Sequence, residues 1–198
     1  LPFSEIQRLH DAMPSNVLLV LDGAYAECAQ ELPGFSDGLE WARDKENVVV
    51  TRTFSKAYGL ASLRIGWAYA PADVAEALNR IRLPFSVTRA GEVAAIAALT
   101  DEAFLRRSVQ TFANGRQRLN GALQKLGLRT LPSAANFVTA CFPNAKDISD
   151  GLARRGVLVR HLAGYGMPDW LRISVGTPDE VTRSTEIVTD VLRSVAQQ

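Results

Sequence analysis

Short apolar runs alternate with polar, helix-like stretches along the first third of the chain. Two runs, residues 17–21 and residues 48–50 with their continuation to residue 54, carry consecutive apolar positions, which predicts strands buried on both faces of a parallel sheet between helices. Residues 65–70 predict a third strand. Residues 72–83 have apolar positions at helical spacing and predict a helix that Pro84 ends.

Helical spacing continues through the middle of the chain, and mixed structure returns in the last third. Asp101 is the expected cap of a long helix that runs to about Leu126, and Gly127 stops it. Thr177 is the expected N-cap of the last helix. Further strands are expected at residues 137–142, 157–160 and 171–175, and further helices at 91–99, 146–155 and 178–196. We therefore predict three parts: residues 1–88, connecting helices over 89–126, and a smaller α/β domain over 127–198.

Composition excludes several classes of protein. The 198 residues include 22 Lys and Arg and 21 Asp and Glu, and the basic residues form no block. We therefore expect no basic surface that would bind nucleic acid or a membrane. The longest apolar run, residues 17–21, is too short to span a bilayer. Cys28 and Cys141 have neither metal nor redox spacing, which indicates free thiols, no metal site and a reducing, cytoplasmic location.

Polar side chains gather where the first two predicted strands end, the edge at which open α/β sheets bind ligands. They are Asp22, Tyr25, Thr53, Ser55, Lys56 and, eight residues after the lysine, Arg64. This set suits pyridoxal 5′-phosphate: the lysine amine forms a Schiff base with the aldehyde, the aspartate keeps the pyridine nitrogen protonated, and the hydroxyls and guanidinium hold the phosphate.

Lys56 is the residue on which this interpretation depends. The chain has four lysines, and the other three, Lys45, Lys125 and Lys146, lie in a charged turn or near helix ends, as solvated lysines do. Lys56 instead lies between an apolar strand and a glycine-containing segment. From residue types alone, a buried structural ion pair between Lys56 and Asp22 remains an alternative.

Three segments resemble a known family. Residues 53–66, TFSKAYGLASLRIG, and residues 21–28, LDGAYAEC, are similar to the lysine and Asp-x-x-Tyr segments of fold-type I pyridoxal-phosphate-dependent aminotransferases of class I and II. Residues 160–180 resemble the C-terminal segment of the histidinol-phosphate aminotransferases within that family, and residues 131–138 resemble the lead into their small-domain strand.

The resemblance implies a role for each residue at the cofactor. Lys56 would form the Schiff base and shuttle a proton between the substrate's Cα and the cofactor's C4′. Asp22 would lie at the pyridine nitrogen and Tyr25 at the phenolic oxygen. The cofactor phosphate would be held by Ser55, Arg64 and, more weakly, Thr53.

The resemblance also implies substrates. Arg172 would bind the anionic group of an amino-acid substrate, and Arg160 would help to hold a substrate phosphate. The implied activity is transfer of an amino group from an amino acid or amino-phosphate to 2-oxoglutarate, in histidine biosynthesis, by a cytoplasmic homodimer. An aromatic amino-acid aminotransferase and a phosphothreonine decarboxylase of the same fold are alternatives, because they differ at the substrate end.

The fold implied is the C-terminal part of the family's large domain, a partial and mostly parallel sheet with flanking helices, followed by the small α/β domain. Ser62 stands where the family usually has glycine, at a cost of about 1 kcal/mol if a positive φ is required there. The backbone amides and the aromatic ring that the family places upstream are not found before Asn16. A catalytically incomplete fragment that does not hold the cofactor is therefore a further alternative.

Overall fold

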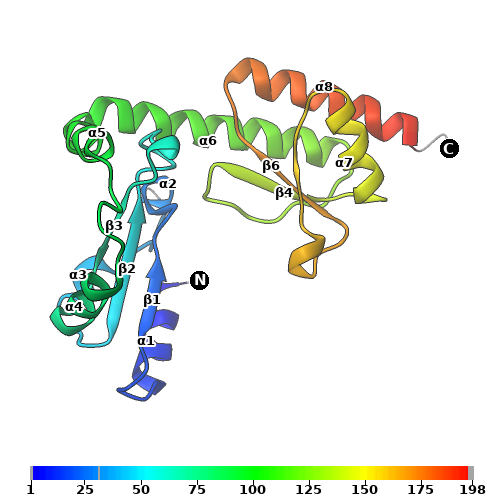
Figure 1. Cartoon of the computed structure of the whole chain (residues 1–198). Coiled ribbons are helices and arrows are strands. Elements are labelled where there is room, and N and C mark those ends of the chain that lie inside the picture. Colours follow the sequence, from blue (N-terminus) through cyan, green and yellow to red (C-terminus); the bar gives the residue numbers. More distant parts are fainter. Residues whose placement is uncertain (1, 31, 196–198) are drawn as a thin grey trace. The chain divides into compact units, whose positions relative to one another are not determined.

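The computed structural model describes residues 2–30 and 32–195 (Figure 1). The chain divides into two compact units, Leu1–Ser108 and Val109–Gln198, here called the first and second units. Helix α6 (Glu102–Lys125) contributes residues to both. The three-part division at residues 88 and 126 stays a prediction.

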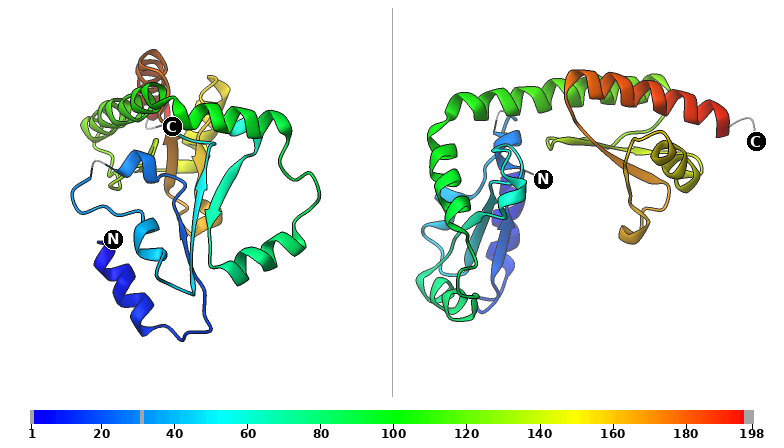
Figure 2. Two further views of the ribbon diagram at one scale, coloured as in Figure 1. Left: turned by 90° about the vertical axis from the view of Figure 1, so that its left-hand side faces the viewer. Right: turned by 45° about the horizontal axis from the view of Figure 1, so that its top comes forward.

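The first unit is built on a three-stranded sheet with β2 in the middle (Figures 1 and 2). Strand β1 (Leu19–Asp22) pairs parallel with β2 (Val48–Thr53), and β2 pairs antiparallel with β3 (Gly66–Tyr69). The expectation of a mostly parallel sheet is therefore wrong. Residues 54–65 contain only the short η1 turn (Ala61–Leu63) and reverse the chain, whereas a parallel neighbour needs a crossover connection.

Among the described residues, five helices accompany this sheet before α6 begins. They are α1 (Phe3–Ala12), α2 (Ala26–Ala29), α3 (Leu39–Ala42), α4 (Ala72–Ile81) and α5 (Arg89–Thr100). The last two confirm the helices predicted at 72–83 and 91–99 within two residues, whereas for α1 to α3 the sequence predicted helix-like stretches without bounds. Helix α1 is held by tertiary contacts, since the rings of Phe3 and His10 both meet Trp41 edge-on.

Burial in the first sheet is uneven. Strand β2 is buried at residues 48–50, and Val48 and Val50 form a small core with Ala42. The expectation that residues 17–21 are buried on both faces is wrong: Leu18 is 48% exposed and Val20 is 56% exposed, because only the alternate side chains Leu19 and Leu21 pack against the small core.

The second unit has its own sheet, in the order β4-β6-β5, with only antiparallel pairings. The strands are β4 (Phe137–Cys141), β5 (Arg160–His161) and β6 (Trp170–Ser174), with the short η2 turn (Ala163–Tyr165) between β5 and β6. The strand predicted at 157–160 begins only at its last residue. Gly156 has a φ of +79° and the Val157 amide bonds to the Leu152 carbonyl, so these residues close the preceding helix.

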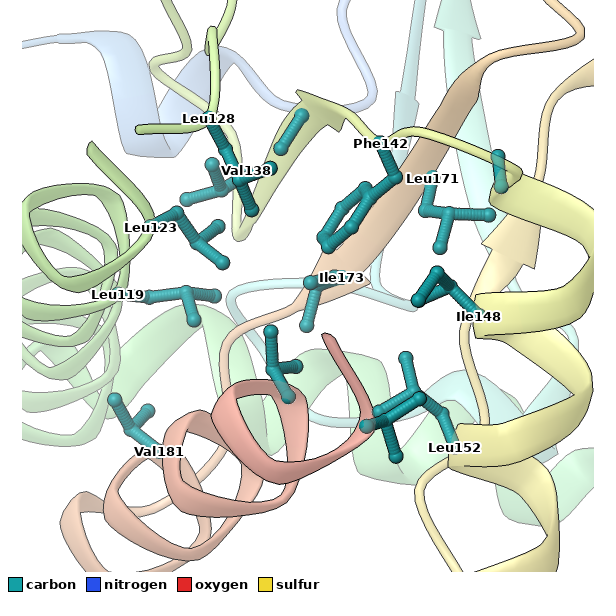
Figure 3. Packing of buried hydrophobic residues seen from close by; sticks show 14 of the residues in the cluster. Leu119, Leu123, Leu128, Val138, Phe142, Ile148, Leu152, Leu171, Ile173 and Val181 are labelled. Carbon is teal, nitrogen blue, oxygen red and sulfur yellow. The ribbon is translucent and has the colours of Figure 1, made fainter. Parts of the chain in front are cut away.

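Three helices pack onto this sheet through one continuous apolar core (Figure 3). Leu119 and Leu123 come from α6, Ile148 and Leu152 from α7 (Ala145–Arg154), and Val181 from α8 (Pro178–Val195); they surround Val138, Phe142, Leu171 and Ile173. These side chains are almost completely inaccessible to solvent. The second unit thus buries its apolar face within itself.

The helix ends follow the sequence closely. Asp101 Oδ1 accepts a hydrogen bond from the Phe104 amide at 2.9 Å, and Gly127 has a φ of +79°, so both predicted boundaries of α6 are confirmed. At α8, the Thr177 amide donates to Glu180 Oε2 at 2.7 Å and the Glu180 amide donates to Thr177 Oγ1 at 3.3 Å, a reciprocal capping box. Residue 196, the predicted end of α8, lies outside the described residues.

Candidate functional site

The first group of candidate residues lies where β1 ends. Asp22 is the last residue of β1 and its register partner is Thr51 of β2. Its Oδ1 accepts a hydrogen bond from the Ala24 amide at 3.0 Å and one from Thr51 Oγ1 at 3.5 Å, which fixes the carboxylate over the turn that leads to Tyr25. Because β1 and β2 are parallel neighbours, the chain leaves both strands at the same edge of the sheet.

Lys56 lies at that same edge, three residues after β2. It is half-buried, and its Nζ lies 5.4 Å from the centre of the Tyr25 ring. Among the residues that the structure describes, no carboxylate lies within ion-pair distance of Nζ, so a structural pair with Asp22 is not observed. The structure therefore places Asp22, Tyr25 and Lys56 on adjacent segments and leaves the amine without a counter-ion among the described residues.

The next segment carries hydroxyl and guanidinium groups. Thr53 Oγ1 accepts a hydrogen bond from the Ser55 amide at 3.1 Å, and Arg64 Nη1 donates to Ser55 Oγ at 3.4 Å and to the Ala61 carbonyl at 2.9 Å. Arg64 is exposed, and with Ser55 it presents a cation and a hydroxyl together, as anion sites do.

The strained backbone of this segment lies at Arg64. Gly59 and Arg64 have positive φ angles, of 72° and 52°, while Ser62 is not among the positive-φ residues. The cost expected at Ser62 is therefore not incurred there. A left-handed residue other than glycine costs about 1 kcal/mol or more, and such residues cluster at functional sites.

The two remaining candidates lie in the second unit, on neighbouring strands. Arg160 of β5 and Arg172 of β6 are register partners, so their side chains leave the same face of the sheet. The Arg172 guanidinium lies 5.0 Å from the Phe137 ring centre, and the Arg160 guanidinium lies 5.8 Å from that of Tyr165. Arg172 Nε is buried and has no hydrogen-bond partner among the described residues, which makes it an unmet donor on this strand.

Sequence reasoning missed a buried ion cluster beside the first group. Arg52 of β2 pairs with Glu27 of α2, between Nη1 and Oε1 at 3.3 Å, and with Asp37. Burial raises the pKa of Glu27 above its usual 4.5, although its own backbone and the charge of Arg52 oppose the rise. Burial, and then the charge of Glu27, raise the pKa of Tyr58. A charged residue inside the apolar run of β2 was the available signal.

The described part of the chain has neither a candidate membrane span nor a candidate metal cluster. No helix there is long and apolar enough to cross a membrane. No group of three or more His, Cys, Asp or Glu side chains is placed to hold a metal ion there.

Residues 1–188 match the family described as aminotransferase class I and II. The chain belongs to this family. It is 45% identical over 193 residues to histidinol-phosphate aminotransferase 1 of Caulobacter vibrioides, covering 95% of this chain and 54% of that protein. It is 49% identical over 183 residues to the histidinol-phosphate aminotransferase of Sphingopyxis alaskensis, covering 89% of this chain and 49% of that protein. This class I and II aminotransferase chain thus spans about half the length of these relatives.

Solved structures of the same family share the fold. The histidinol-phosphate aminotransferase of Sinorhizobium meliloti, in complex with pyridoxal-5′-phosphate, superimposes with a TM-score of 0.88 at 37% identity, covering 98% of this chain and 54% of that one. The α/β fold expected for this aminotransferase chain is confirmed by that likeness.

Proposed function

We propose that this chain is the part of a histidinol-phosphate aminotransferase that carries the cofactor lysine and two substrate arginines. The observation that carries the proposal is the placement of Lys56 Nζ 5.4 Å from the Tyr25 ring, at the sheet edge where Asp22 ends the neighbouring strand. Relatives of the same family that are 45% and 49% identical to the chain bear that name. The assignment to histidine biosynthesis follows from it.

Pyridoxal 5′-phosphate, which the Sinorhizobium meliloti enzyme binds, fits the residues present. A half-buried lysine with no carboxylate partner among the described residues suits an amine that must react with a carbonyl group. A serine hydroxyl 3.4 Å from an exposed guanidinium suits a phosphate. When bound, the cofactor supplies an aldehyde that holds the substrate nitrogen and a ring that accepts electron density from the substrate's α-carbon.

Three residues would act on the reacting end. Lys56 Nζ would hold the aldehyde, then remove the proton from the substrate's α-carbon and return it later. Asp22, fixed by the Ala24 amide, would accept a hydrogen bond from the protonated ring nitrogen and keep that proton in place. The Tyr25 hydroxyl would donate a hydrogen bond to the phenolic oxygen.

Three further residues would hold the cofactor phosphate. Arg64 and Ser55 would bind it directly, with the guanidinium as a two-point donor. Thr53 would act through Ser55, because its hydroxyl already accepts the Ser55 amide at 3.1 Å. The phosphate would thereby fix the depth at which the ring enters the site.

Arg160 and Arg172 would select the substrates. Two guanidinium groups on opposed register positions attract a ligand with two negative charges. A phosphate ester that carries an amine and 2-oxoglutarate both meet that requirement, so one pair of arginines would serve both halves of an amino-group exchange. A phosphothreonine decarboxylase of Porphyromonas gingivalis is 22% identical over the shared fold, a likeness that shows the fold alone.

The proposal includes the wider setting. We propose that the whole protein works as a homodimer in the cytoplasm, and that residues 1–88 of this chain belong to its large cofactor domain.

The first experiment asks which lysine binds the cofactor. The chain is incubated with pyridoxal 5′-phosphate, reduced with borohydride and digested, and the modified peptide is found by mass spectrometry. We expect modification of Lys56, none in Lys56→Ala, and an unchanged result in Lys45→Ala, a matched control that removes a lysine lying over the Trp41 ring instead. Equal modification of Lys45 and Lys56 would contradict the proposal, and an unmodified Lys56 would favour a fragment that does not hold the cofactor.

The second experiment measures the reaction. Histidinol phosphate and 2-oxoglutarate are supplied with the cofactor, and glutamate is measured. Lys56→Ala should abolish glutamate formation without changing the circular dichroism spectrum, because the substitution leaves the apolar runs of the sheet intact. Turnover of Lys56→Ala at the rate of the unsubstituted protein would end the proposal.

A further inference from the structure

Arg52 is the centre of a buried link between segments that carry the candidate site. It lies on β2, four residues before Lys56, and its side chain is only 5% exposed. Arg52 and Glu27 are the two charged residues that the structure buries in its described part. Such deep burial is unusual for an arginine, so its contacts require an explanation.

The Arg52 guanidinium joins three separate segments. Nη1 donates to Glu27 Oε1 at 3.3 Å, and Glu27 lies two residues after Tyr25. Nη2 donates to Asp37, whose other oxygen accepts the Leu39 amide at 2.9 Å at the start of α3. A planar fork of donors bridges two carboxylates in a fixed geometry, which a lysine cannot do.

The stem of Arg52 also lies against the turn that follows Asp22. A Cβ atom at Gly23 would fall 2.8 Å from Arg52 Cδ and 2.9 Å from Arg52 Nε, closer than real Cβ contacts allow. The Gly23 amide donates to the Thr51 carbonyl at 2.9 Å, which draws the turn onto β2. The position of the Asp22–Tyr25 turn therefore depends on where the Arg52 side chain lies.

Stability alone is a weak reason for this cluster. One guanidinium faces two carboxylates, and Glu27 Oε2 and Arg52 Nε have no hydrogen-bond partner among the described residues. Buried ion clusters of this kind are often no more stable than well-packed apolar side chains, and their best-supported effect is to fix one arrangement of the chain.

We propose that Arg52 is a positioning residue: its bridge to Glu27 and Asp37 fixes the turn that carries Asp22 and Tyr25 against the segment that carries Lys56, and so sets the site for its cofactor. This inference rests on the proposed function for its second half, the cofactor. The first half, that Arg52 fixes the turn at residues 22–25, does not depend on the cofactor and can be tested on the chain alone.

The test compares Arg52→Met, which keeps the length of the stem, with Arg52→Lys, which keeps the charge but not the fork. Arg43→Met is the matched control, because Arg43 also pairs with a glutamate of the first unit but is exposed. Amide hydrogen exchange is measured in the cofactor-free chain at residues 22–30 and, as an internal reference, at residues 48–50. Fixation of pyridoxal 5′-phosphate on Lys56 by borohydride is measured against cofactor concentration.

We expect Arg52→Met to speed exchange at residues 22–30 by about tenfold or more, since charge-assisted hydrogen bonds are lost, and to leave residues 48–50 unchanged. The cofactor concentration for half-maximal fixation on Lys56 should rise by a similar factor. For Arg52→Lys, both the exchange rate at residues 22–30 and the half-maximal cofactor concentration should lie between those of Arg52→Met and the unsubstituted chain. For Arg43→Met, both should equal those of the unsubstituted chain. If Arg52→Met does not fold, Glu27→Gln replaces it, since it keeps the size of the side chain and removes the negative charge that Arg52 Nη1 meets at 3.3 Å, and it should give the same local pattern.

Two results would overturn the positioning role: unchanged exchange at residues 22–30, or equal acceleration at residues 48–50, which would indicate general loosening. Local acceleration with unchanged fixation on Lys56 would overturn the link to the cofactor. A parent chain that never becomes modified at Lys56 would count against the proposed function, while the exchange measurements would still decide whether Arg52 fixes the turn.

Discussion

The two units of the chain bury different kinds of side chain. The second unit encloses one continuous apolar core, with side chains such as Leu119, Leu152 and Phe142 almost wholly inaccessible. The first unit has a small core around Val48 and Val50 and buries an arginine and a glutamate beside it. Among the described residues, sixteen large apolar side chains of the first unit are exposed, against three of the second.

Apolar packing, which stabilises the fold, is therefore concentrated in the second unit, whereas buried charges and most of the candidate cofactor residues lie in the first. The second unit meets the requirement of a domain that packs its own apolar surface, and its two candidate arginines are side chains of paired strands. In the first unit, the candidate residues Asp22, Tyr25 and Lys56 lie at strand ends or in loops, where ordered polar groups replace apolar packing. Substitutions of apolar core residues should therefore change the free energy of unfolding mainly in the second unit. Substitutions of buried charged residues should have their effect mainly in the first unit.

Removal of a large core side chain tests the comparison most strongly. Phe142 is 1% exposed in the second-unit core, and Phe142→Ala should lower the free energy of unfolding by about 3–5 kcal/mol, through lost burial and the cavity that remains. Phe85→Ala, at a side chain 97% exposed in the first unit, should change it by less than about 0.5 kcal/mol. Urea unfolding measures both, and similar losses for the two variants would contradict the comparison.

Two glycines of α6 measure how tightly the second unit is packed. A Cβ at Gly115 would overlap the Val175 side chain, so Gly115→Ala should destabilise the chain by about 1–3 kcal/mol. A Cβ at Gly121 meets nothing within 4 Å, so Gly121→Ala should stabilise it by about 0.5–1 kcal/mol through helix propensity. Thermal unfolding should shift in opposite directions, and two shifts of the same sign would show that the core adapts.

Helix caps should act alike in both units because capping is local. Thr177 caps α8 in the second unit, and Thr88 caps α5 in the first, where its Oγ1 accepts the Gly91 amide at 3.0 Å. Thr177→Ala and Thr88→Ala should each cost their own helix about 1 kcal/mol, read from amide exchange in α8 and α5. A much larger loss at Thr88 would show that α5 depends on this single bond because little core supports it.

The smallest expected effect is a pH dependence of opposite sign in the two units. The pKa of Glu27 is raised by burial, so stability relative to Glu27→Gln should fall as the pH rises from 4.5 through that raised pKa. The pKa of Glu180 is lowered by its bonds to Thr177, so its stabilising effect relative to Glu180→Gln should be complete above 4.5 and lost as the pH falls through that lowered pKa. Unfolding measured on both sides of pH 4.5 should give opposite slopes.

Local signals predicted much of this structure. Apolar runs located β2, and capping residues located both ends of α6 and the start of α8, because these depend on neighbours in sequence. A parallel sheet with Asp22 and Lys56 where its first two strands end was also predicted, and β1 and β2 do pair in parallel. The individual roles of these residues stay predictions.

Features set by distant contacts were not predictable in this way. The reversal of β3 depends on which strands become neighbours, and the exposure of β1 depends on what packs against each of its faces. Helix α1 depends on two rings that meet Trp41. The Arg52 cluster combines residues from three segments, and a charge within an apolar run does not show which carboxylates it will meet.

The left-handed backbone of Arg64 has a consequence for how this chain can vary. Glycine adopts a φ of 52° with less backbone strain than arginine does, so Arg64→Gly should remove strain from this loop. The same change would remove the guanidinium that meets Ser55. Stability and anion binding thus compete at one position, and selection for thermal tolerance alone should favour glycine there while selection for the proposed reaction should preserve arginine.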